Sequence, residues 1–543
     1  MAHHLLSSIK TFPARLGRLS GRKAYAAAFG FGALMALAMP PFNLFPLVFV
    51  SLPALIVLLR GTQNLRQAFA MGWYFAFGFF VPGLYWVAAS MFVEFNRFWW
   101  AIPFSVVGLP ALLALFYGGA AMLAKRLGPE GLSGTVTFGL MWFLADYARG
   151  HLFTGFPWLL LGHTWSGVLP VLQITSVIGI YGLTLLTAVA ASLPAAPASR
   201  SNRYAQTAAV LFFLVLAAWG AMRLASTPDP LFEDVRLRLV QPNIPQADKW
   251  RADVREKNFR ELLALTQAPA EEPPSHIIWP EAASPYFLAE EPARLQAIAE
   301  ALPPNASLIT GVLRRALDQE GRVRYYNALI AIDDKGRLAA AYDKTHLVPF
   351  GEYMPFRTIL PLDAVAASDE DFSAGPKPQT LRVPGLPSFS PLICYEAIFP
   401  SAVTDAADRP AFLLNVTNDA WFGRTTGPYQ HAAFARIRAI EEGMSLVRVG
   451  DTGISEIVDS LGRIRKKLGL EQKGFIDYGL PKPLPPTFFA KTQDLLVWMI
   501  FFALFLSQRN ILKRITFGKE KLGLNTNSKR PNRLDKHEIK KQT

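Results

Sequence analysis

The chain has 543 residues, of which 51% are hydrophobic and only 18% are charged, whereas soluble domains typically carry about 25% charged residues. This composition excludes a disordered chain and argues against an ordinary soluble protein. A single cysteine, Cys394, excludes an intrachain disulfide and a cysteine-rich zinc site. The net charge of +14 is typical of proteins that meet anionic lipid or nucleic acid.

The chain before residue 226 consists largely of apolar segments. A helix needs about 20 mostly apolar residues to cross a bilayer. Seven candidates lie near 24–41, 44–60, 67–91, 98–123, 132–148, 169–193 and 205–224. The fifth also carries an acid, Asp146, and an eighth span is predicted within 488–513. We therefore expect a seven-span membrane domain over 24–226 and about eight spans in all.

Lys and Arg residues gather before the first span and in every second turn, which predicts that these regions are cytoplasmic. The N-terminal segment 1–23 and the basic tail 514–543 then lie in the cytoplasm, and the region between spans seven and eight lies on the opposite side. The tail is interpreted as a topology-fixing segment that touches anionic lipid. No aromatic interleaving or known motif favours binding to nucleic acid.

Between residues 233 and 480 the pattern changes to short β-branched or aromatic runs that alternate with helical stretches. Strands are predicted at 235–240, 276–279, 328–332, 337–342, 389–393, 411–416, 445–450 and 456–458, and a helix at 429–442. The strands 328–332 and 337–342 flank a turn and are predicted to form a hairpin. Strands alternating with helices indicate a layered α/β domain with a buried sheet.

Three residues of reactive type follow apolar strands in this domain: Glu281, Lys344 and Cys394. A free cysteine has a pKa of about 8.5 and needs help to act as a nucleophile. A neighbouring carboxylate accepts its proton, and an ammonium group stabilises the thiolate and an oxyanion. The three together form a set capable of acyl transfer without histidine, although a lone cysteine after a strand is more often a small core residue.

Short motifs around these residues carry a resemblance to a known family. Trp-Pro-Glu at 279–281, Tyr-Asp-Lys at 342–344 and Ile-Cys-Tyr-Glu at 393–396 stand in the order of the nitrilase superfamily. With seven spans before and one after, the chain resembles the apolipoprotein N-acyltransferase family over nearly its whole length. Further matching motifs lie at 241–246 with Trp250, 344–352, 415–423 and 428–431.

The resemblance implies an αββα sandwich for 233–480 and a role for each matched residue. Cys394 is expected to be the nucleophile, Glu281 the general base and Lys344 the oxyanion stabiliser, assisted by the backbone N–H of Tyr395. Residues expected to support the active site are Glu352, Tyr395, Glu396 and Asn327, and residues expected to face substrate are Trp250, Trp158 and Trp421.

The resemblance also implies the reaction. The acyl donor is a phospholipid, commonly phosphatidylethanolamine, and the acceptor is the N-terminal amine of a diacylglyceryl-cysteine apolipoprotein. The expected location is a bacterial inner membrane with the catalytic domain on the periplasmic side. No metal or other cofactor is expected, because no metal-binding or nucleotide-binding motif is present. The apolar segments 347–350, 353–361 and 420–422 are either a lipid-facing rim or ordinary loop packing.

One position departs from the family pattern. Before Thr-Gly-Ile-Ser at 452–455, where the family commonly has an Asn-containing stretch, this chain has Asp451. This acid is expected to alter a loop or a substrate contact without touching Glu281, Lys344 or Cys394.

Three alternative functions remain at this point. The first is a membrane-tethered amidase or nitrilase with the same three residues, and the second is a non-catalytic scaffold or transporter. The third is a cysteine protease in which His346 or His431 assists Cys394.

Overall fold

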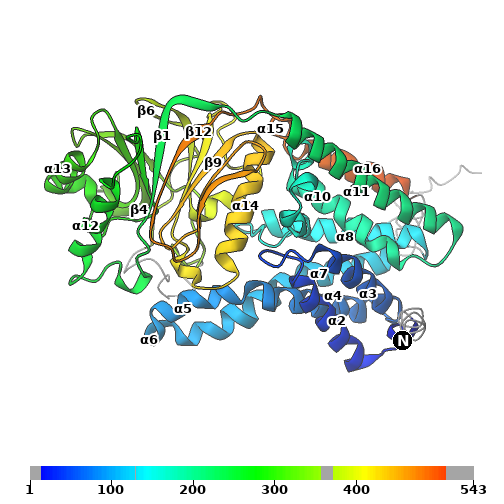
Figure 1. The fold of residues 1–543 in the computed structure, drawn as a ribbon. Coiled ribbons are helices and arrows are strands. Elements are labelled where there is room, and N and C mark those ends of the chain that lie inside the picture. The colour runs from blue at the N-terminus through cyan, green and yellow to red at the C-terminus, as the bar shows by residue number, and fades with distance from the viewer. Residues whose placement is uncertain (1–13, 129, 356–370, 509–543) are drawn as a thin grey trace, which may run out of the picture.

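The structure, a computed structural model, describes residues 14–128, 130–355 and 371–508. The predicted basic tail at 514–543, most of the N-terminal segment 1–23 and part of the predicted rim at 353–361 lie outside the described residues. Figure 1 shows two parts, a helical bundle and a β-sandwich, which lie side by side.

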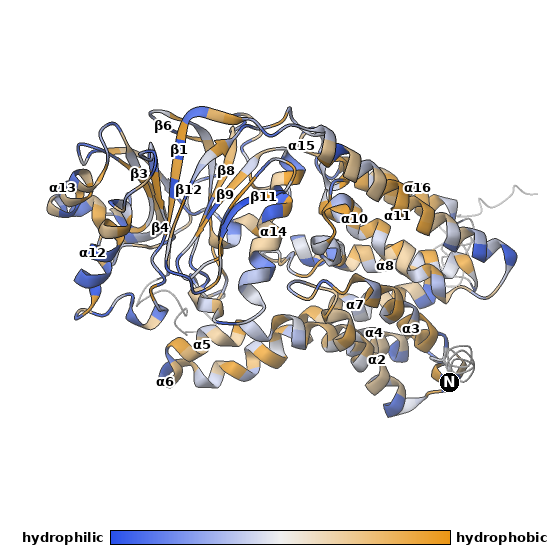
Figure 2. Ribbon diagram, in the orientation of Figure 1, coloured by the Kyte–Doolittle hydropathy of each residue, from blue (hydrophilic) through white to orange (hydrophobic). Residues whose placement is uncertain are grey.

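The bundle consists of helices from both ends of the chain. Its longer helices are α2 (Gly21–Ala36), α3 (Val48–Arg60), α4 (Leu65–Leu84), α7 (Leu109–Leu127), α8 (Leu132–His151), α10 (Thr175–Ser192), α11 (Arg200–Ser226) and α16 (Leu495–Ser507). Its short helices are α5 (Ala89–Val93), α6 (Phe95–Phe98), α9 (Leu169–Leu172) and α15 (Phe488–Thr492). In Figure 2 most of these helices have the orange colour of hydrophobic residues, whereas the sandwich contains both hydrophobic and hydrophilic residues.

Four helical stretches among the described residues are long and apolar enough to cross a membrane. They are Leu65–Val93, Phe95–Leu127, Thr175–Ala195 and Arg200–Ser226, and the apolar helices Phe45–Arg60 and Leu495–Ser507 are shorter. A membrane-type bundle is therefore present, and the count of about eight spans stays a prediction.

The acid in the fifth predicted span is satisfied inside the bundle. Asp146 in α8 accepts hydrogen bonds from Arg149, one turn further on, at 2.9 Å and from the hydroxyl of Tyr117. Arg149 also donates to the carbonyl oxygens of Phe156 and Trp158. A buried charge in such a bundle needs a partner, and this pair also fixes the loop that follows α8.

The sandwich contains two six-stranded sheets. The first has the order β12-β1-β2-β3-β4-β5 and the second β11-β10-β9-β8-β7-β6. The strands of the first sheet are β1 (Leu231–Gln241), β2 (His276–Trp279), β3 (Ser307–Leu317), β4 (Val323–Asp333), β5 (Leu338–Asp343) and β12 (Gly474–Pro481). The strands of the second are β6 (Leu381–Val383), β7 (Leu386–Ile393), β8 (Phe412–Thr417), β9 (Ser445–Gly450), β10 (Ser455–Val458) and β11 (Ile464–Leu468).

Each sheet has three parallel strands at its centre and antiparallel strands outside them. β1, β2 and β3 are parallel in the first sheet, and β7, β8 and β9 in the second. Since side chains alternate along a strand, Phe412, Leu414 and Val416 of β8 enter the core between the sheets, while Leu413 faces the helix on the other side. The chain thus forms an αββα sandwich, as the resemblance implied.

The two helical layers of the sandwich differ in what covers them. α12 (Arg255–Thr266) and α13 (Pro292–Ala301) pack on the outer face of the first sheet, away from the bundle (Figure 1). α14 (Gly427–Glu442) lies between the second sheet and the bundle. Its Ala435 and Ala439 contact the sheet, and its Phe434, Ile437 and Ile440 join the core of the bundle. The bundle and the sandwich therefore share one helix as a common layer.

Each of the eight predicted strands and the predicted helix has an observed counterpart, but four observed strands, β3, β6, β11 and β12, were not predicted. The strands at 276–279 and 445–450 have the predicted bounds, and β4 and β5 pair as the predicted hairpin. β3 has no clear alternating pattern, because its second half is partly exposed and carries two arginines. A glycine in its middle, Gly311, also weakened the strand pattern.

Candidate active site

Glu281 lies at a tight corner after β2. The next residue, Ala282, has a positive φ of 46°. The neighbouring strand approaches this corner so closely that a Cβ on Gly311 would lie 2.5 Å from Cα of Glu281. Gly311 also donates a backbone hydrogen bond to the carbonyl of Pro280 at 3.1 Å. A glycine inside a strand often marks such a close approach, so Gly311 is the signal in the sequence that could have located this corner.

The carboxylate of Glu281 is buried, and both of its oxygens accept hydrogen bonds. Its Oε1 accepts a hydrogen bond from Nδ2 of Asn327 at 2.7 Å, and its Oε2 accepts one from the backbone N–H of Asn418 at 2.8 Å. The ammonium of Lys344 lies 3.8 Å from Oε1. These contacts come from both sheets, and together they fix the orientation of the carboxylate.

Lys344 follows β5 and is 1% exposed. Its ammonium donates to Oε1 of Glu352 at 2.9 Å, and Asn327 donates to the same oxygen at 2.7 Å. Asn327 thus bridges the two carboxylates, and Lys344 faces both of them. The structure brings together Glu281, Lys344, Asn327 and Glu352, all of which the resemblance singled out.

Cys394 forms a second tight corner after β7. It is 9% exposed and has a positive φ of 51°, which is a strained backbone conformation for a residue with a side chain. Its carbonyl oxygen accepts a hydrogen bond from Nε2 of His431 at 3.1 Å and a longer one from Nδ2 of Asn415 at 3.4 Å. Two buried donors therefore hold the backbone of the only cysteine.

Glu396 connects this corner to the segment that carries Lys344. Its Oε2 accepts from the backbone N–H of Ile393 at 2.8 Å, and its Oε1 accepts from the hydroxyl of Tyr342 and the backbone N–H of Thr345, both at 2.8 Å. A single carboxylate thus sets the position of the cysteine relative to the lysine.

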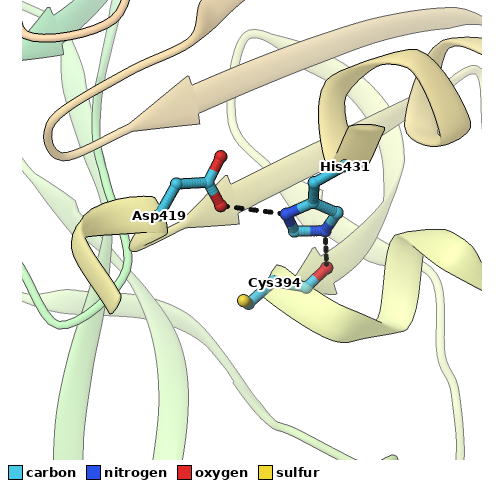
Figure 3. A group of neighbouring side chains, drawn as sticks. All are labelled: Cys394, Asp419 and His431. Carbon is cyan, nitrogen blue, oxygen red and sulfur yellow. Dashed lines mark hydrogen bonds and ion pairs between the residues drawn. The ribbon is translucent and has the colours of Figure 1, made fainter. Parts of the chain in front are cut away.

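Figure 3 shows why His431 is poorly placed as a base for Cys394. One ring nitrogen contacts the carbonyl of Cys394, the other lies 2.9 Å from Asp419, and the sulfur points away from the ring. Asp419 is also ion-paired with Arg448 at 2.6 Å. These contacts weigh against the protease alternative based on His431. His346, the other candidate, stacks on Phe399 at 3.9 Å.

Cys394, Asp419 and His431 form the one group of potential metal ligands in the described part of the chain. Ligand atoms of Cys394, Asp419 and His431 lie within 4.8 Å of one another. The histidine nitrogens and the aspartate oxygens are already used by hydrogen bonds and by Arg448. The group is therefore a poor fit for a metal ion.

The electrostatics of the site require a base. Burial, together with the negative charge of Glu281, raises the pKa of the Cys394 thiol well above its ordinary value. Burial also raises the pKa of Glu281, although Lys344 opposes this effect. Burial disfavours the Lys344 ammonium, but Glu352 and Glu281 outweigh it and raise the pKa of the lysine. At neutral pH the cysteine is thus a thiol, and Lys344 stays charged.

The tryptophans expected to face substrate lie in different surroundings. Trp250 is 45% exposed and Trp421 is half-buried. Trp158 is 1% exposed and donates its indole N–H to Gln430 of α14 at 2.7 Å. It lies between the bundle and the sandwich and has no open face, because Phe434 and His431 pack against it. In this structure its contacts are those of a packing residue.

The cysteine corner also contacts the bundle. The hydroxyl of Tyr395 donates to the carbonyl of Gly155, in the loop after α8, at 3.1 Å. Gln430 of α14 accepts hydrogen bonds from the indoles of both Trp158 and Trp86. The residue after the cysteine and the helix behind it are therefore both fixed to the bundle.

A buried Cys, Glu and Lys at the strand ends of an αββα sandwich define a nitrilase-type domain. The family model described as carbon-nitrogen hydrolase matches residues 236–481, and the model of the apolipoprotein N-acyltransferase N-terminal domain matches residues 31–193. An amidase from Nesterenkonia sp. is a solved structure with 20% identity. It covers 49% of this chain and 97% of its own, with a TM-score of 0.35, which is too low to support an assignment.

Curated relatives extend the match over most of the chain. The apolipoprotein N-acyltransferase of Brucella melitensis is 41% identical over 87% of this chain and 92% of its own length. That of Rhodopseudomonas palustris is 38% identical over 86% of this chain and 90% of its own length. The chain belongs to the apolipoprotein N-acyltransferase family.

Proposed function

We propose that this chain transfers an acyl group from a phospholipid to the N-terminal amine of an apolipoprotein through a thioester on Cys394. The observation that carries the proposal is the hydrogen bond from Tyr395, the neighbour of Cys394, to the loop after α8. The nucleophile is thereby held against an apolar bundle, where substrates with acyl chains gather. Each CH₂ of such a chain costs about 0.8 kcal/mol to expose to water, so access from the bilayer favours lipid substrates.

In the first half-reaction the sulfur of Cys394 attacks the ester carbonyl of the donor. Glu281 takes the thiol proton and passes it to the leaving alkoxide, so that a lysophospholipid departs and a thioester remains. Lys344 stabilises the negative charge on the carbonyl oxygen, assisted by the backbone N–H of Tyr395. Asn327 and Glu352 hold Glu281 and Lys344 in place.

In the second half-reaction the amine of the acceptor attacks the thioester. The carbon–sulfur bond breaks, an amide bond forms, and Glu281 carries the amine proton to the departing thiolate. The reaction is a ping-pong transfer, and the buried position of Cys394 limits attack by water on the thioester.

Finer features of the function are part of the same proposal. Phosphatidylethanolamine is the expected donor, and a diacylglyceryl-cysteine is the expected N-terminus of the acceptor. The enzyme lies in a bacterial inner membrane with its sandwich on the periplasmic side and both termini in the cytoplasm, in agreement with the basic alternate turns. Trp250 and Trp421 face the substrates, and their exposure supports this role.

The test is to incubate the purified full chain with phosphatidylethanolamine and a diacylglyceryl lipopeptide that has a free amine. The proposal predicts an N-acylated lipopeptide and a lysophospholipid in equal amounts, and neither product with Cys394→Ala. Hydrolysis of small amides without acyl transfer would favour the amidase alternative. If the wild-type chain forms neither product and Cys394→Ala is harmless in cells, a non-catalytic scaffold would be favoured.

A further inference from the structure

A buried ion pair adjoins the backbone of Glu281. Lys249 and Asp451 have side chains that are 1% and 0% exposed, and their charged atoms lie 2.7 Å apart. The Lys249 ammonium also donates a hydrogen bond to the backbone carbonyl of Glu281 at 3.1 Å. The acid that departs from the family pattern therefore has a partner, and that partner contacts the corner of the base.

Asp451 is itself fixed by the segments around it. Its Oδ1 accepts a hydrogen bond from the backbone N–H of Ile244, and its backbone carbonyl accepts one from Asn243 at 2.9 Å. Its own backbone N–H donates to the carbonyl of Thr417, at the end of β8, at 3.1 Å. The pair thus joins both sheets directly behind the site.

The location of the Lys249–Asp451 ion pair indicates a role at the active site in addition to any contribution to stability. A buried ion pair is often no more stabilising than an apolar pair of the same size, but removal of one partner leaves a costly unpaired charge. Here the cation lies against the carbonyl of a residue whose neighbour, Ala282, has a positive φ. The next residue after Lys249 is the exposed Trp250.

We propose that Lys249, held by Asp451, is a positioning residue for the general base Glu281. It fixes the base through its backbone carbonyl and anchors the loop that presents Trp250. The inference rests on the proposed role of Glu281 as the base. The charged groups that act on the Glu281 carboxylate are Lys344, Glu352 and Lys249, and the positive charge of Lys249 lowers the pKa of Glu281.

The test measures alkylation of Cys394 by iodoacetamide in the purified full chain as a function of pH. In this reaction a sulfur–carbon bond forms, iodide leaves and Glu281 takes the thiol proton, so no lipid substrate is needed. A failure of acyl transfer alone would overturn the proposed function and leave this test unaffected. The variants are Lys249→Met, Asp451→Asn, Lys249→Arg and the double variant Lys249→Met with Asp451→Leu.

Lys249→Met is expected to lower the alkylation rate at its plateau about tenfold, because the carbonyl of Glu281 loses its donor. The acid limb is the part of the pH profile where the rate falls as Glu281 is protonated. Lys249→Met moves this limb to higher pH, because the loss of a positive charge raises the pKa of Glu281. Asp451→Asn moves it to lower pH, because the positive charge of Lys249 is no longer balanced and lowers that pKa further. The double variant returns the limb towards its wild-type position while the plateau stays low, and Lys249→Arg recovers part of the plateau.

Opposite movements of the acid limb distinguish positioning of the base from a purely structural role. The matched control is Arg238→Met, which removes another buried cation that pairs with an aspartate, Asp477, and binds backbone carbonyls. This control is expected to leave the acid limb in place. The proposal is overturned if the limb moves in the same direction in both single variants, or stays fixed in both. If Lys249→Met does not fold, Asp451→Asn alone decides: the proposal is overturned if the acid limb of its alkylation rate lies at the same pH as in the wild type.

Discussion

The two corners that carry Glu281 and Cys394 are built alike but are attached to different parts of the molecule. Each follows a central parallel strand, and each includes a positive φ, at Ala282 and at Cys394 itself. Each has its carbonyl held by a buried donor, Lys249 for the base and His431 for the cysteine. An aspartate contacts each donor. Glu281 and Cys394 are thus held in place through the backbone as well as through their side chains.

The difference lies in the outer contacts. The corner of Glu281 is held by residues of the sandwich, such as Asn327 and Asn418. The corner of Cys394 also contacts the bundle, through Tyr395 and through Trp158 and α14. The proposed base is therefore held within the sandwich, whereas the proposed nucleophile is also fixed to the helical bundle.

The largest expected effect comes from removal of the base. Glu281→Gln keeps the size of the side chain but cannot accept the thiol proton. We expect acyl transfer to fall by roughly 10³-fold, within the range for loss of a general base. The measurement is the rate of lipopeptide acylation, with Arg238→Met as a control for a buried polar change elsewhere in the sandwich. A loss of less than about threefold would contradict the role of Glu281 as the base.

The pH profile of the wild-type chain is the second expected effect. Burial raises the pKa of Glu281 above its ordinary value of 4.5. The base works only when ionised, so the acylation rate falls as the pH decreases through this raised pKa. The acid limb is therefore expected above pH 4.5, and it disappears with Glu281→Gln. A limb that persists in this variant would assign the titration to another group.

The third prediction concerns the donor that holds the cysteine corner. His431→Ala removes the 3.1 Å hydrogen bond to the carbonyl of Cys394, and we expect the rate of thiol alkylation to fall about tenfold. Because Glu281 and not His431 is the proposed base, the acid limb is expected to stay in place. His163→Gln, another buried histidine that stacks on Phe434 away from the cysteine, is the matched control. Loss of the acid limb in His431→Ala would revive the protease alternative.

The smallest expected effect tests the contact between the nucleophile and the bundle. Tyr395→Phe removes one hydrogen bond to Gly155, which is worth about 1 kcal/mol, or roughly fivefold in rate. Tyr286→Phe also removes a hydroxyl hydrogen bond, to Glu256, but within the sandwich. We expect only Tyr395→Phe to slow acylation by phospholipid. Equal effects of the two variants would remove the distinction between the two corners.

The fold was largely predictable because its strands are short apolar runs that end at polar residues. The strands at 276–279 and 445–450 and the hairpin of β4 and β5 were predicted from such patterns. β3 was missed because its second half is charged and partly exposed, so that alternation did not reveal it.

The candidate site was predictable only in part. Glu281, Lys344 and Cys394 stand at strand ends, where sequence alone draws attention to them. The partnership of Lys249 with Asp451 joins residues about 200 positions apart, so no local pattern reveals it. Trp158 was expected to face substrate, but the helix that buries it lies more than 250 residues further along the chain. Such pairings depend on how the two sheets and the bundle assemble.

The most direct test of the proposed thioester is mass spectrometry of the purified chain after incubation with phospholipid. One fatty acyl group is expected as a thioester on Cys394, and it is expected to be released when a lipopeptide amine is added. Glu281→Ala is expected to show no such adduct. Acylation of the lipopeptide by a wild-type chain whose Cys394 stays unmodified under all conditions would contradict the proposed thioester. Acyl transfer by Cys394→Ala would contradict it as well.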